Sequence, residues 1–392
     1  MQLVQDIVAR QAEHRGWRRD IHAHPELAYN EHRTADLVAA KLESFGIPVV
    51  RGLGKTGVVG TLKAGNSDRS IGLRADMDAL PLTEMNTFAH ASTHAGVMHA
   101  CGHDGHTTML LAAAEYLAAH RDFDGIVQFI FQPAEEGEAG ARAMMDDGLF
   151  RDFPMDAVYA LHNWPGMPVG HMAMRKGPAM AAFDVFEVTL TGHGGHAALP
   201  HLVVDPIQVG VALVQAWQTI VSRNVKPTEP AVLSVTQFHA GDAWAVVPEQ
   251  AVLRGTVRSF APEVRALVER RMQEVAAGVC AAHGCRFDWH YEHRFPPTIN
   301  SAAETDIAAA AAAAVCGAEH VDSNVEQVTG SEDFGYMLEE KPGCYAFIGN
   351  GPGDGGCLLH SPHFDFNDDI IPIGASYFVR LVEDQLQPGA VR

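Results

Sequence analysis

A short stretch near residue 100 concentrates side chains that can bind metals. Residues 98–106 read Met-His-Ala-Cys-Gly-His-Asp-Gly-His, so a thiol, several imidazoles and a carboxylate stand close together. Cys101 and His103 are separated by one glycine, and a thiolate beside an imidazole is a donor pair that suits zinc, manganese or nickel ions. The spacing indicates a candidate metal site. A lone cysteine in such a setting is also typical of a small buried apolar side chain.

Further candidate ligands stand at the ends of later apolar runs. Glu135 and Glu136 follow one run, His162 ends another, and His360 lies in a loop rich in Gly and Pro. Taken singly, adjacent glutamates are most often a solvated helix start, and a histidine after a strand is most often a core residue. Taken together, these side chains predict a shared site for two divalent ions. The five expected ligands are Cys101, His103, Glu136, His162 and His360.

Glu135 is the one carboxylate of this group that is not among the expected ligands. An acidic side chain next to a ligand, yet not itself a ligand, can take a proton from an attacking water and pass it to the leaving nitrogen. We therefore expect Glu135 to be the general base and acid of a hydrolytic reaction. A cysteine-nucleophile hydrolase that uses Cys101 and His103 is a competing interpretation. It predicts that thiol alkylation abolishes activity and that chelators do not.

Between residues 70 and 183 the chain alternates strand-like and helix-like patterns. The strand-like runs are 71–74, 126–131 and 157–161, and the helical patterns are 106–119 and 140–147. This alternation predicts an α/β fold, with a mixed, mostly parallel sheet flanked by helices. Ligands bind such sheets beyond the carboxyl ends of the strands. Glu135, Glu136 and His162 are all expected at that edge.

The pattern changes after residue 183. Longer strand-like runs alternate with two helices whose starts are marked by Asp205-Pro206 and Pro262. This segment predicts an inserted α+β domain, a four-stranded sheet with two helices on one face. The first pattern resumes after residue 294. We therefore expect a discontinuous catalytic domain at 1–183 and 295–392, and an inserted domain at 184–294.

Composition narrows the classes of function. The chain has 392 residues, and 28 Lys plus Arg against 48 Asp plus Glu give a net charge of -20. This acidity argues against nucleic acid and against anionic membrane surfaces, whose phosphates would be repelled. The sequence shows neither a signal-peptide pattern nor an apolar stretch of membrane length, and its six cysteines are scattered. A cytoplasmic protein is expected.

Seven ordered motifs resemble the M20 metallopeptidase family, specifically its amidohydrolase branch of hippurate hydrolases and plant auxin-conjugate hydrolases. They span essentially the whole chain, at 74–81, 99–106, 131–137, 162–166, 192–198, 330–334 and 360–366. The resemblance implies a zinc-peptidase-like catalytic domain. It implies two divalent ions, of manganese, zinc, cobalt or nickel, with Glu135 as general base and acid. It assigns the ions to Cys101, His103, Glu136, His162 and His360.

The resemblance also implies roles outside the ligand set. Asp78 would support the metal site by orienting a ligand. The inserted domain would be a lid and would form a homodimer, or a dimer-based oligomer, in which His196 reaches the partner subunit's site and stabilises the tetrahedral oxyanion. Arg258 would pair with a substrate carboxylate. The simpler alternatives are a turn-capping role for His196 and a surface salt bridge for Arg258.

One segment departs from the pattern of that family. Relatives commonly carry Asn-Val-Ile-Pro where this chain has Ala245-Val246-Val247-Pro248, so the asparagine that contacts the substrate is missing. Carboxylate recognition is therefore expected to be weaker. Trp244, just before this segment, could favour an aromatic group.

These features predict a metal-dependent amidohydrolase of N-acyl amino acids. Its substrates would be N-acetyl, N-benzoyl or similar conjugates, and its products a carboxylic acid and a free amino acid. A dipeptidase or aminopeptidase of the same family is the nearest alternative, although no clear set of acidic groups for a free α-amine stands in the sequence. A non-catalytic metal- or ligand-binding protein is the other alternative, but it would have no use for Glu135.

Overall fold

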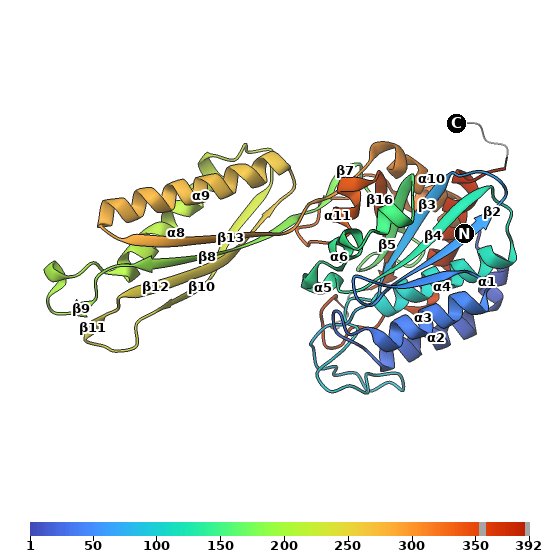
Figure 1. Ribbon diagram of the computed structural model, residues 1–392, viewed down its shortest axis with the longest axis horizontal. Coiled ribbons are helices and arrows are strands. Elements are labelled where there is room, and N and C mark those ends of the chain that lie inside the picture. The colour runs from blue at the N-terminus through green and yellow to red at the C-terminus, as the bar shows by residue number, and fades with distance from the viewer. Residues whose placement is uncertain (353–357, 389–392) are drawn as a thin grey trace. The chain divides into compact units, whose positions relative to one another are not determined.

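The chain divides into two compact units, which we describe separately (Figure 1). The computed structural model describes residues 1–352 and 358–388, so Cys357 and the last residues of the predicted catalytic segment lie outside it. The first unit comprises Met1–Ala179, Ile299–Glu326 and Asp333–Arg392. The second comprises Met180–Thr298 and Gln327–Glu332. The short segment Gln327–Glu332 returns to the second unit, which no sequence pattern indicated.

The first unit is built on an eight-stranded sheet in the order β1-β2-β4-β3-β5-β16-β6-β15. The strands are β1 (Val49–Leu53), β2 (Gly57–Ala64), β3 (Ser70–Asp76), β4 (Gly125–Gln132), β5 (Ala157–Pro165), β6 (Met172–Ala173), β15 (Val321–Asp322) and β16 (Gly343–Gly351). The central strands β4, β3, β5 and β16 are parallel, whereas β1 and β2 form an antiparallel edge. Every residue of β3 is buried, because both faces of the sheet are covered. The predicted mostly parallel α/β sheet flanked by helices is confirmed.

One helix of the first unit is buried on nearly all sides, and the other helices of the unit lie around it. The helices are α1 (Gln5–Ala9), α2 (Gln11–Ala23), α3 (His32–Ser44), α4 (His103–Ala119), α5 (Glu135–Glu138), α6 (Gly140–Asp146), α7 (Leu149–Asp152), α10 (Ala302–Cys316), α11 (Gly335–Glu340) and α12 (Ile371–Gln385). α4 packs against α2, α3, α12 and strand β3. Its amino end carries His103, so packing of this helix fixes part of the predicted site.

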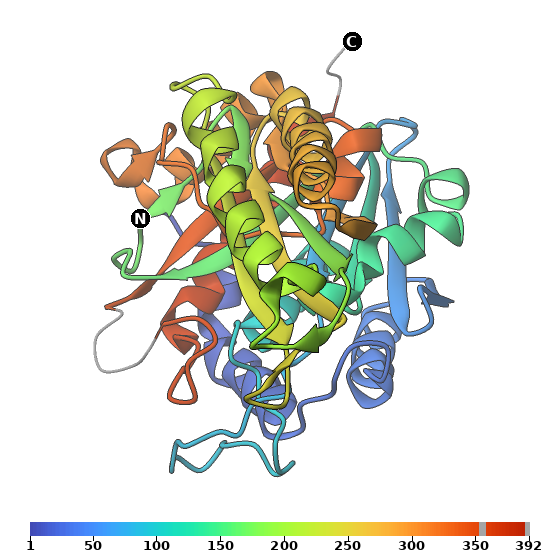
Figure 2. The ribbon, with the colours of Figure 1, turned by 90° about the vertical axis from the view of Figure 1, so that its left-hand side faces the viewer.

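The second unit is an antiparallel sheet with two helices on one face. Its strands, in the order β10-β12-β8-β13, are β10 (Ala231–Ala240), β12 (Gln250–Ser259), β8 (Ala182–Thr191) and β13 (Arg286–Phe295). α8 (Pro206–Arg223) and α9 (Pro262–His283) lie side by side over it (Figure 2). Burial alternates along β8, since one face of the strand packs beneath the helices. Strands β9 (Gly195–His196) and β11 (Val246–Val247) pair separately, and β7 (Gly177–Met180) and β14 (Thr298–Asn300) lie where the chain passes between units.

Local signals explain the helix bounds of the second unit. The Asp205 side chain accepts the amide hydrogen of Ile207 at 2.9 Å, and Pro206 occupies the first helical turn of α8. α9 begins at Pro262 and ends before Gly284, which is left-handed with φ 70°. Both predicted helix starts are confirmed.

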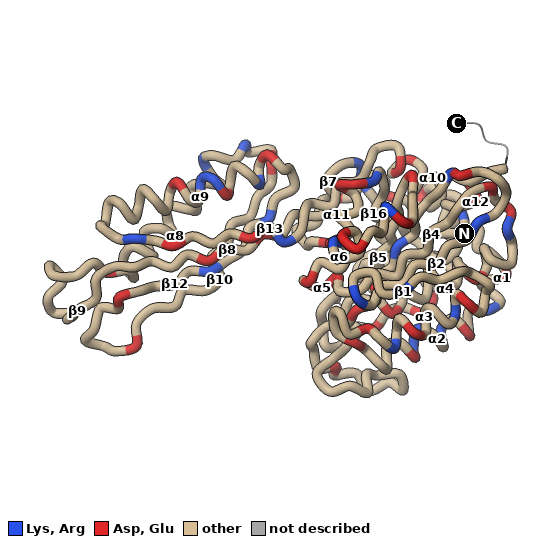
Figure 3. The backbone as a smooth tube through the Cα atoms, viewed as in Figure 1, with Lys and Arg blue, Asp and Glu red and all other residues tan. Residues whose placement is uncertain are grey.

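Along the chain of both units, Lys and Arg residues alternate with Asp and Glu residues, so neither sign of charge is confined to one unit (Figure 3). Across residues 1–352 and 358–388, no helix has the length and apolar character that a bilayer crossing requires.

Candidate metal centre and active site

The carboxyl ends of the parallel strands position the candidate site of the first unit. Asp76 is the last residue of β3, Glu135 and Glu136 follow β4 in the short helix α5, and His162 lies toward the end of β5. His103 opens α4, which packs against β3. The strand-end arrangement expected for ligand sites in parallel sheets is therefore present.

Two groups of candidate donor atoms share the Cys101 thiol. One group consists of Cys101, His103 and His162, and the other of Cys101, Glu136 and His360; within each group the donor atoms lie within 4.8 Å of one another. Cys101 Sγ lies 3.4 Å from His162 Nε2, and His360 Nε2 lies 3.2 Å from Glu136 Oε1. All five predicted ligands thus meet at one place. Two sets that share a thiolate suit a pair of neighbouring ions.

Gly102 allows Cys101 and His103 to face the same point. Its φ of 102° is left-handed, a conformation that glycine adopts without strain. A Cβ added at this residue would lie 2.2 Å from Asn163 Oδ1. The tight turn and the close approach of Asn163 both require glycine here.

His103 is oriented from behind by Asp78. The ring Nδ1 lies 2.9 Å from the backbone oxygen and 3.1 Å from the carboxylate Oδ1 of Asp78. Asp78 Oδ2 also accepts the amide hydrogen of Glu136 at 2.9 Å. The other ring nitrogen, His103 Nε2, is buried with no hydrogen-bond partner among the described residues. This nitrogen lies 3.7 Å from Asp76 Oδ2 and 4.0 Å from Glu136 Oε1. A histidine held through one nitrogen, with the other directed at acidic groups without a hydrogen bond, has the arrangement of a metal ligand, so the residues present fit a metal ion.

The electrostatics of the cluster also suit a cation. Burial favours the neutral ring of His103, but the charges of Asp76 and Asp78 outweigh burial and raise the pKa of His103 to about 10. Burial and the charges of Glu136 and Glu135 raise the pKa of the Cys101 thiol well above its usual range. Acidic groups therefore hold protons in the cluster. A divalent ion would displace these protons, because metal ligands bind in their deprotonated forms.

Asp76 anchors a buried network that the sequence interpretation did not include. Its carboxylate lies 2.7 Å from Arg74 Nη1 and 2.6 Å from His106 Nδ1, and His106 Nε2 lies 2.7 Å from Asn163 Oδ1. Burial favours the neutral carboxyl, but the charges of His103, Arg74 and His106 hold the pKa of Asp76 well below its usual range. In the sequence, Asp76 was marked only by its place in the motif at 74–81.

Glu135 is buried, with 7% of its surface exposed, and joins His103 and Glu136 in a further group of neighbouring donor atoms. Its carboxylate therefore lies beside the candidate ligands. Ala134, the residue before it, has a left-handed φ of 55°, which turns the chain sharply after β4.

A pocket of about 530 Å³ adjoins Glu136 in the first unit. Leu27, Tyr29, Lys55 and Pro81 are among the residues that line it. Tyr29 and Lys55 both have left-handed backbones, and the Lys55 ammonium lies 3.9 Å from the centre of the Tyr29 ring. The pocket offers apolar and aromatic surface directly beside the candidate metal centre.

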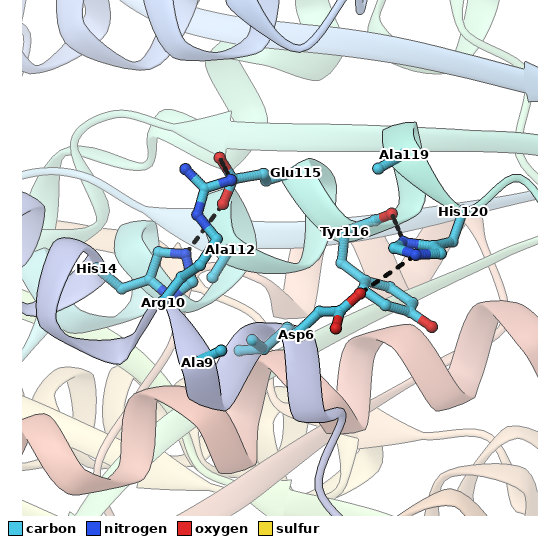
Figure 4. Close-up of a pocket in the computed structure, with 10 residues that line it drawn as sticks. Asp6, Ala9, Arg10, His14, Ala112, Glu115, Tyr116, Ala119 and His120 are labelled. Carbon is cyan, nitrogen blue, oxygen red and sulfur yellow. Dashed lines mark hydrogen bonds and ion pairs between the residues drawn. The ribbon is translucent and has the colours of Figure 1, made fainter.

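Figure 4 shows another pocket of the first unit, of about 270 Å³, between α1, α2 and α4. Arg10 pairs there with Glu115 at 2.7 Å, and His120 lies 3.2 Å from Asp6. The described lining contains no predicted site residue, so we place the reaction at the strand ends instead.

His196 and Arg258 belong to the second unit. His196 is exposed in β9, opposite Val246 of β11, and its Nδ1 accepts the amide hydrogen of Ala198 at 3.1 Å. Arg258 is half-buried in β12; it donates to the Ser331 hydroxyl, and its guanidinium lies 4.0 Å from the centre of the Phe183 ring. Their predicted roles remain predictions.

Known proteins resemble this chain in sequence and in structure along most of its length. Residues 72–384 match the family model of peptidase family M20/M25/M40. The chain is 42% identical over 381 residues to hippurate hydrolase of Campylobacter jejuni, covering 97% of this chain and 98% of that one. It is 43% identical over 286 residues to an N-acyl-L-amino acid amidohydrolase of Geobacillus stearothermophilus, covering 72% and 77%. The solved structure of a Bacillus subtilis dinuclear metal binding peptidase of family M20 superposes with a TM-score of 0.85 at 33% identity, covering 97% and 99%. The chain belongs to peptidase family M20/M25/M40.

Proposed function

We propose that this chain is a two-metal amidohydrolase that cleaves N-acyl amino acids to a carboxylic acid and a free amino acid. The observation that carries this proposal is the arrangement of Glu135 beside two donor groups that share Cys101. Relatives named for hippurate and for N-acyl-L-amino acids support this class of substrate. The pocket beside Glu136 offers room for an acyl group or an amino acid side chain.

Two divalent ions, of manganese, zinc, cobalt or nickel, would be held by the shared-thiolate cluster. The similar dinuclear metal binding peptidase supports two ions, and the buried Nε2 of His103, which makes no hydrogen bond to the described residues, supports a ligand role for that residue. The ligands we propose are Cys101, His103, Glu136, His162 and His360. When bound, the ions would supply Lewis acidity toward the scissile carbonyl and lower the pKa of a water.

The chain's own residues would then carry the proton transfers. Glu135 takes a proton from the attacking water as a general base and delivers it to the leaving nitrogen as a general acid. Asp78 holds both His103 and the amide of Glu136, so it keeps two proposed ligands in a fixed relation.

For the second unit we propose recognition and assembly. It would form a lid and a homodimer, His196 would stabilise the tetrahedral oxyanion in the partner subunit, and Arg258 would bind the substrate carboxylate. Phe183 beneath the Arg258 guanidinium and the Ser331 hydroxyl beside it hold that cation in place. Ala245 replaces the usual asparagine, so binding should rest more on Arg258. A cytoplasmic location is proposed because the five described cysteines are free thiols.

The test is release of amino acid from a panel of N-acetyl, N-benzoyl and N-indoleacetyl amino acids and dipeptides. Chelated protein is assayed with and without manganese, zinc, cobalt or nickel. We expect metal-dependent release from the acyl amino acids. Release from dipeptides alone would make the chain a peptidase, and full activity in chelator with loss on thiol alkylation would restore the cysteine-nucleophile interpretation.

A further inference from the structure

A buried carboxylate, Glu31, connects segments that are far apart in the chain. It stands just before α3 and is 0% exposed. Its Oε1 accepts the amide hydrogens of Tyr29 at 3.0 Å and of Ala134 at 2.9 Å, and its Oε2 accepts the Thr56 hydroxyl at 2.5 Å. A buried carboxylate is unfavourable unless it is hydrogen-bonded. These three hydrogen bonds therefore offset the cost of burying the Glu31 carboxylate.

Two of the three bonds end at backbone amides of left-handed residues, and the third ends at the hydroxyl of Thr56, which follows another. Tyr29 has φ 61° and Ala134 has φ 55°, and Thr56 follows Lys55, which has φ 73°. None of these residues is glycine, so each left-handed conformation must be held by its surroundings. Strain of this kind gathers at functional sites. Here Tyr29 and Lys55 line the pocket beside Glu136, and Ala134 directly precedes Glu135.

Glu135 is bracketed by two carboxylates that hold its neighbours' amides. Glu31 binds the amide of Ala134 on one side, and Asp78 binds the amide of Glu136 on the other, each at 2.9 Å. Asp78 also orients His103, so one anchor faces the proposed metal ligands. Glu31 holds the other neighbour of Glu135, Ala134, on the side of the pocket.

We propose that Glu31 is a positioning residue for the catalytic carboxylate Glu135, acting through the amide of Ala134. This proposal rests on the proposed function, in which Glu135 transfers the proton. Glu31 does not touch the substrate. It fixes the turn that presents Glu135, and through Tyr29 it fixes a wall of the adjoining pocket.

The experiment compares metal-loaded full-length variants in the amino acid release assay. Glu31→Met keeps the volume and removes both acceptors, so kcat should fall about 100-fold, the effect of a misplacement near 1 Å. Metal content should stay near the wild-type value, and KM should change less than kcat, because Tyr29 is only one of the residues that line the pocket. Glu31→Gln can still offer one oxygen to both amides and should retain kcat within about fivefold. Glu43→Met changes an exposed glutamate of α3 and is the matched control.

Glu31→Asp tests the positioning role if Glu31→Met does not fold. It keeps the charge but is one methylene shorter, so it does not reach both amides, and kcat should fall at least about 10-fold. Wild-type kcat in the Met or Asp variant would overturn the proposal, as would a loss that appears in KM or metal content instead. Wild-type protein that cleaves no N-acyl amino acid would overturn the proposed function itself. An active wild type and an inactive Glu135→Gln, beside unaffected Glu31 variants, would overturn only the positioning role.

Discussion

Both units have an apolar core, but they differ in the ionisable side chains that they bury: the second unit buries Asp184, which pairs with Arg265, whereas the first buries a cluster of such groups. The first unit encloses ionisable groups near the carboxyl ends of its strands, including Asp76, His103 and Asp104, each at most 1% exposed. The second unit fills the space between sheet and helices with apolar side chains such as Trp217 and Met272. Buried ionisable groups are costly unless they are paired or bind a metal. The candidate metal ligands therefore lie together in the first unit, whereas the core of the second unit is mainly apolar.

The strongest test of this contrast is Glu135→Gln. Removing the proton carrier should lower kcat by at least about 1,000-fold, in the range that general acid–base catalysis supplies. Metal content, measured by mass spectrometry, should not change. Glu138→Gln is the matched control, because Glu138 is an exposed acid in the same short helix. Equal activity of the two variants would remove Glu135 from the reaction.

A cysteine in each unit sharpens the comparison. Cys101→Ser should lower metal affinity about 100-fold, because a shared soft ligand is replaced by a weaker one. Cys280→Ser changes a buried cysteine of the second unit and should leave metal content unaltered. Isothermal titration of the chelated proteins with zinc measures both affinities. If both variants bound zinc as tightly as wild type, Cys101 would not be a ligand.

Arg258→Met tests recognition by the second unit. Loss of a charge-assisted bond to the substrate carboxylate should raise KM about 30-fold for N-acyl amino acids. The matching amino acid amides, which lack the carboxylate, should show no such change. Arg254→Met is the control, since Arg254 lies on the same strand and pairs with Glu187. A similar KM change for both arginine variants would argue against a specific carboxylate site.

The smallest expected effect is on the pH dependence of the free energy of unfolding, through the buried side chain of His14. Burial lowers the pKa of His14, and the bond to Glu115 opposes this only in part. As pH falls below the unfolded pKa, near 6.5, the unfolded chain binds the proton more readily, so stability present above that pH declines. His14→Gln should reduce this decline by less than about 1 kcal/mol, measured by denaturant unfolding at several pH values.

The sequence predicted elements well where local signals mark both ends. α9 was expected from Pro262 to about residue 283 and has those bounds, because proline starts it and Gly284 ends it. No element was predicted before residue 70, where β1 and β2 add an antiparallel edge to the sheet. Pairing between strands depends on contacts across the sheet that short-range patterns do not encode.

The residues of the candidate site also differ in how far the sequence predicted them. The predicted ligands lie in short motifs whose chemistry is visible in the sequence, and the structure brings them together, although their roles as ligands remain a prediction. Of the supporting groups, Asp78 was expected from the family resemblance, whereas Glu31 and His106 were not predicted. Glu31 meets the amide of Ala134 across 103 residues, and His106 meets Asn163 across 57. Such partners follow from side-chain directions in the folded chain.

The discontinuous first unit has a consequence for synthesis of the chain. Ala179 closes its first segment, yet His360 and the partner of Arg18, Asp365, come much later. At about 5–20 residues per second, a ribosome needs roughly 10 to 40 seconds to pass from one to the other. During that interval the second unit can complete its own core. The half-built first unit, in which Arg18 still lacks Asp365 and Glu136 still lacks His360, is therefore the species that chaperones would meet on the ribosome.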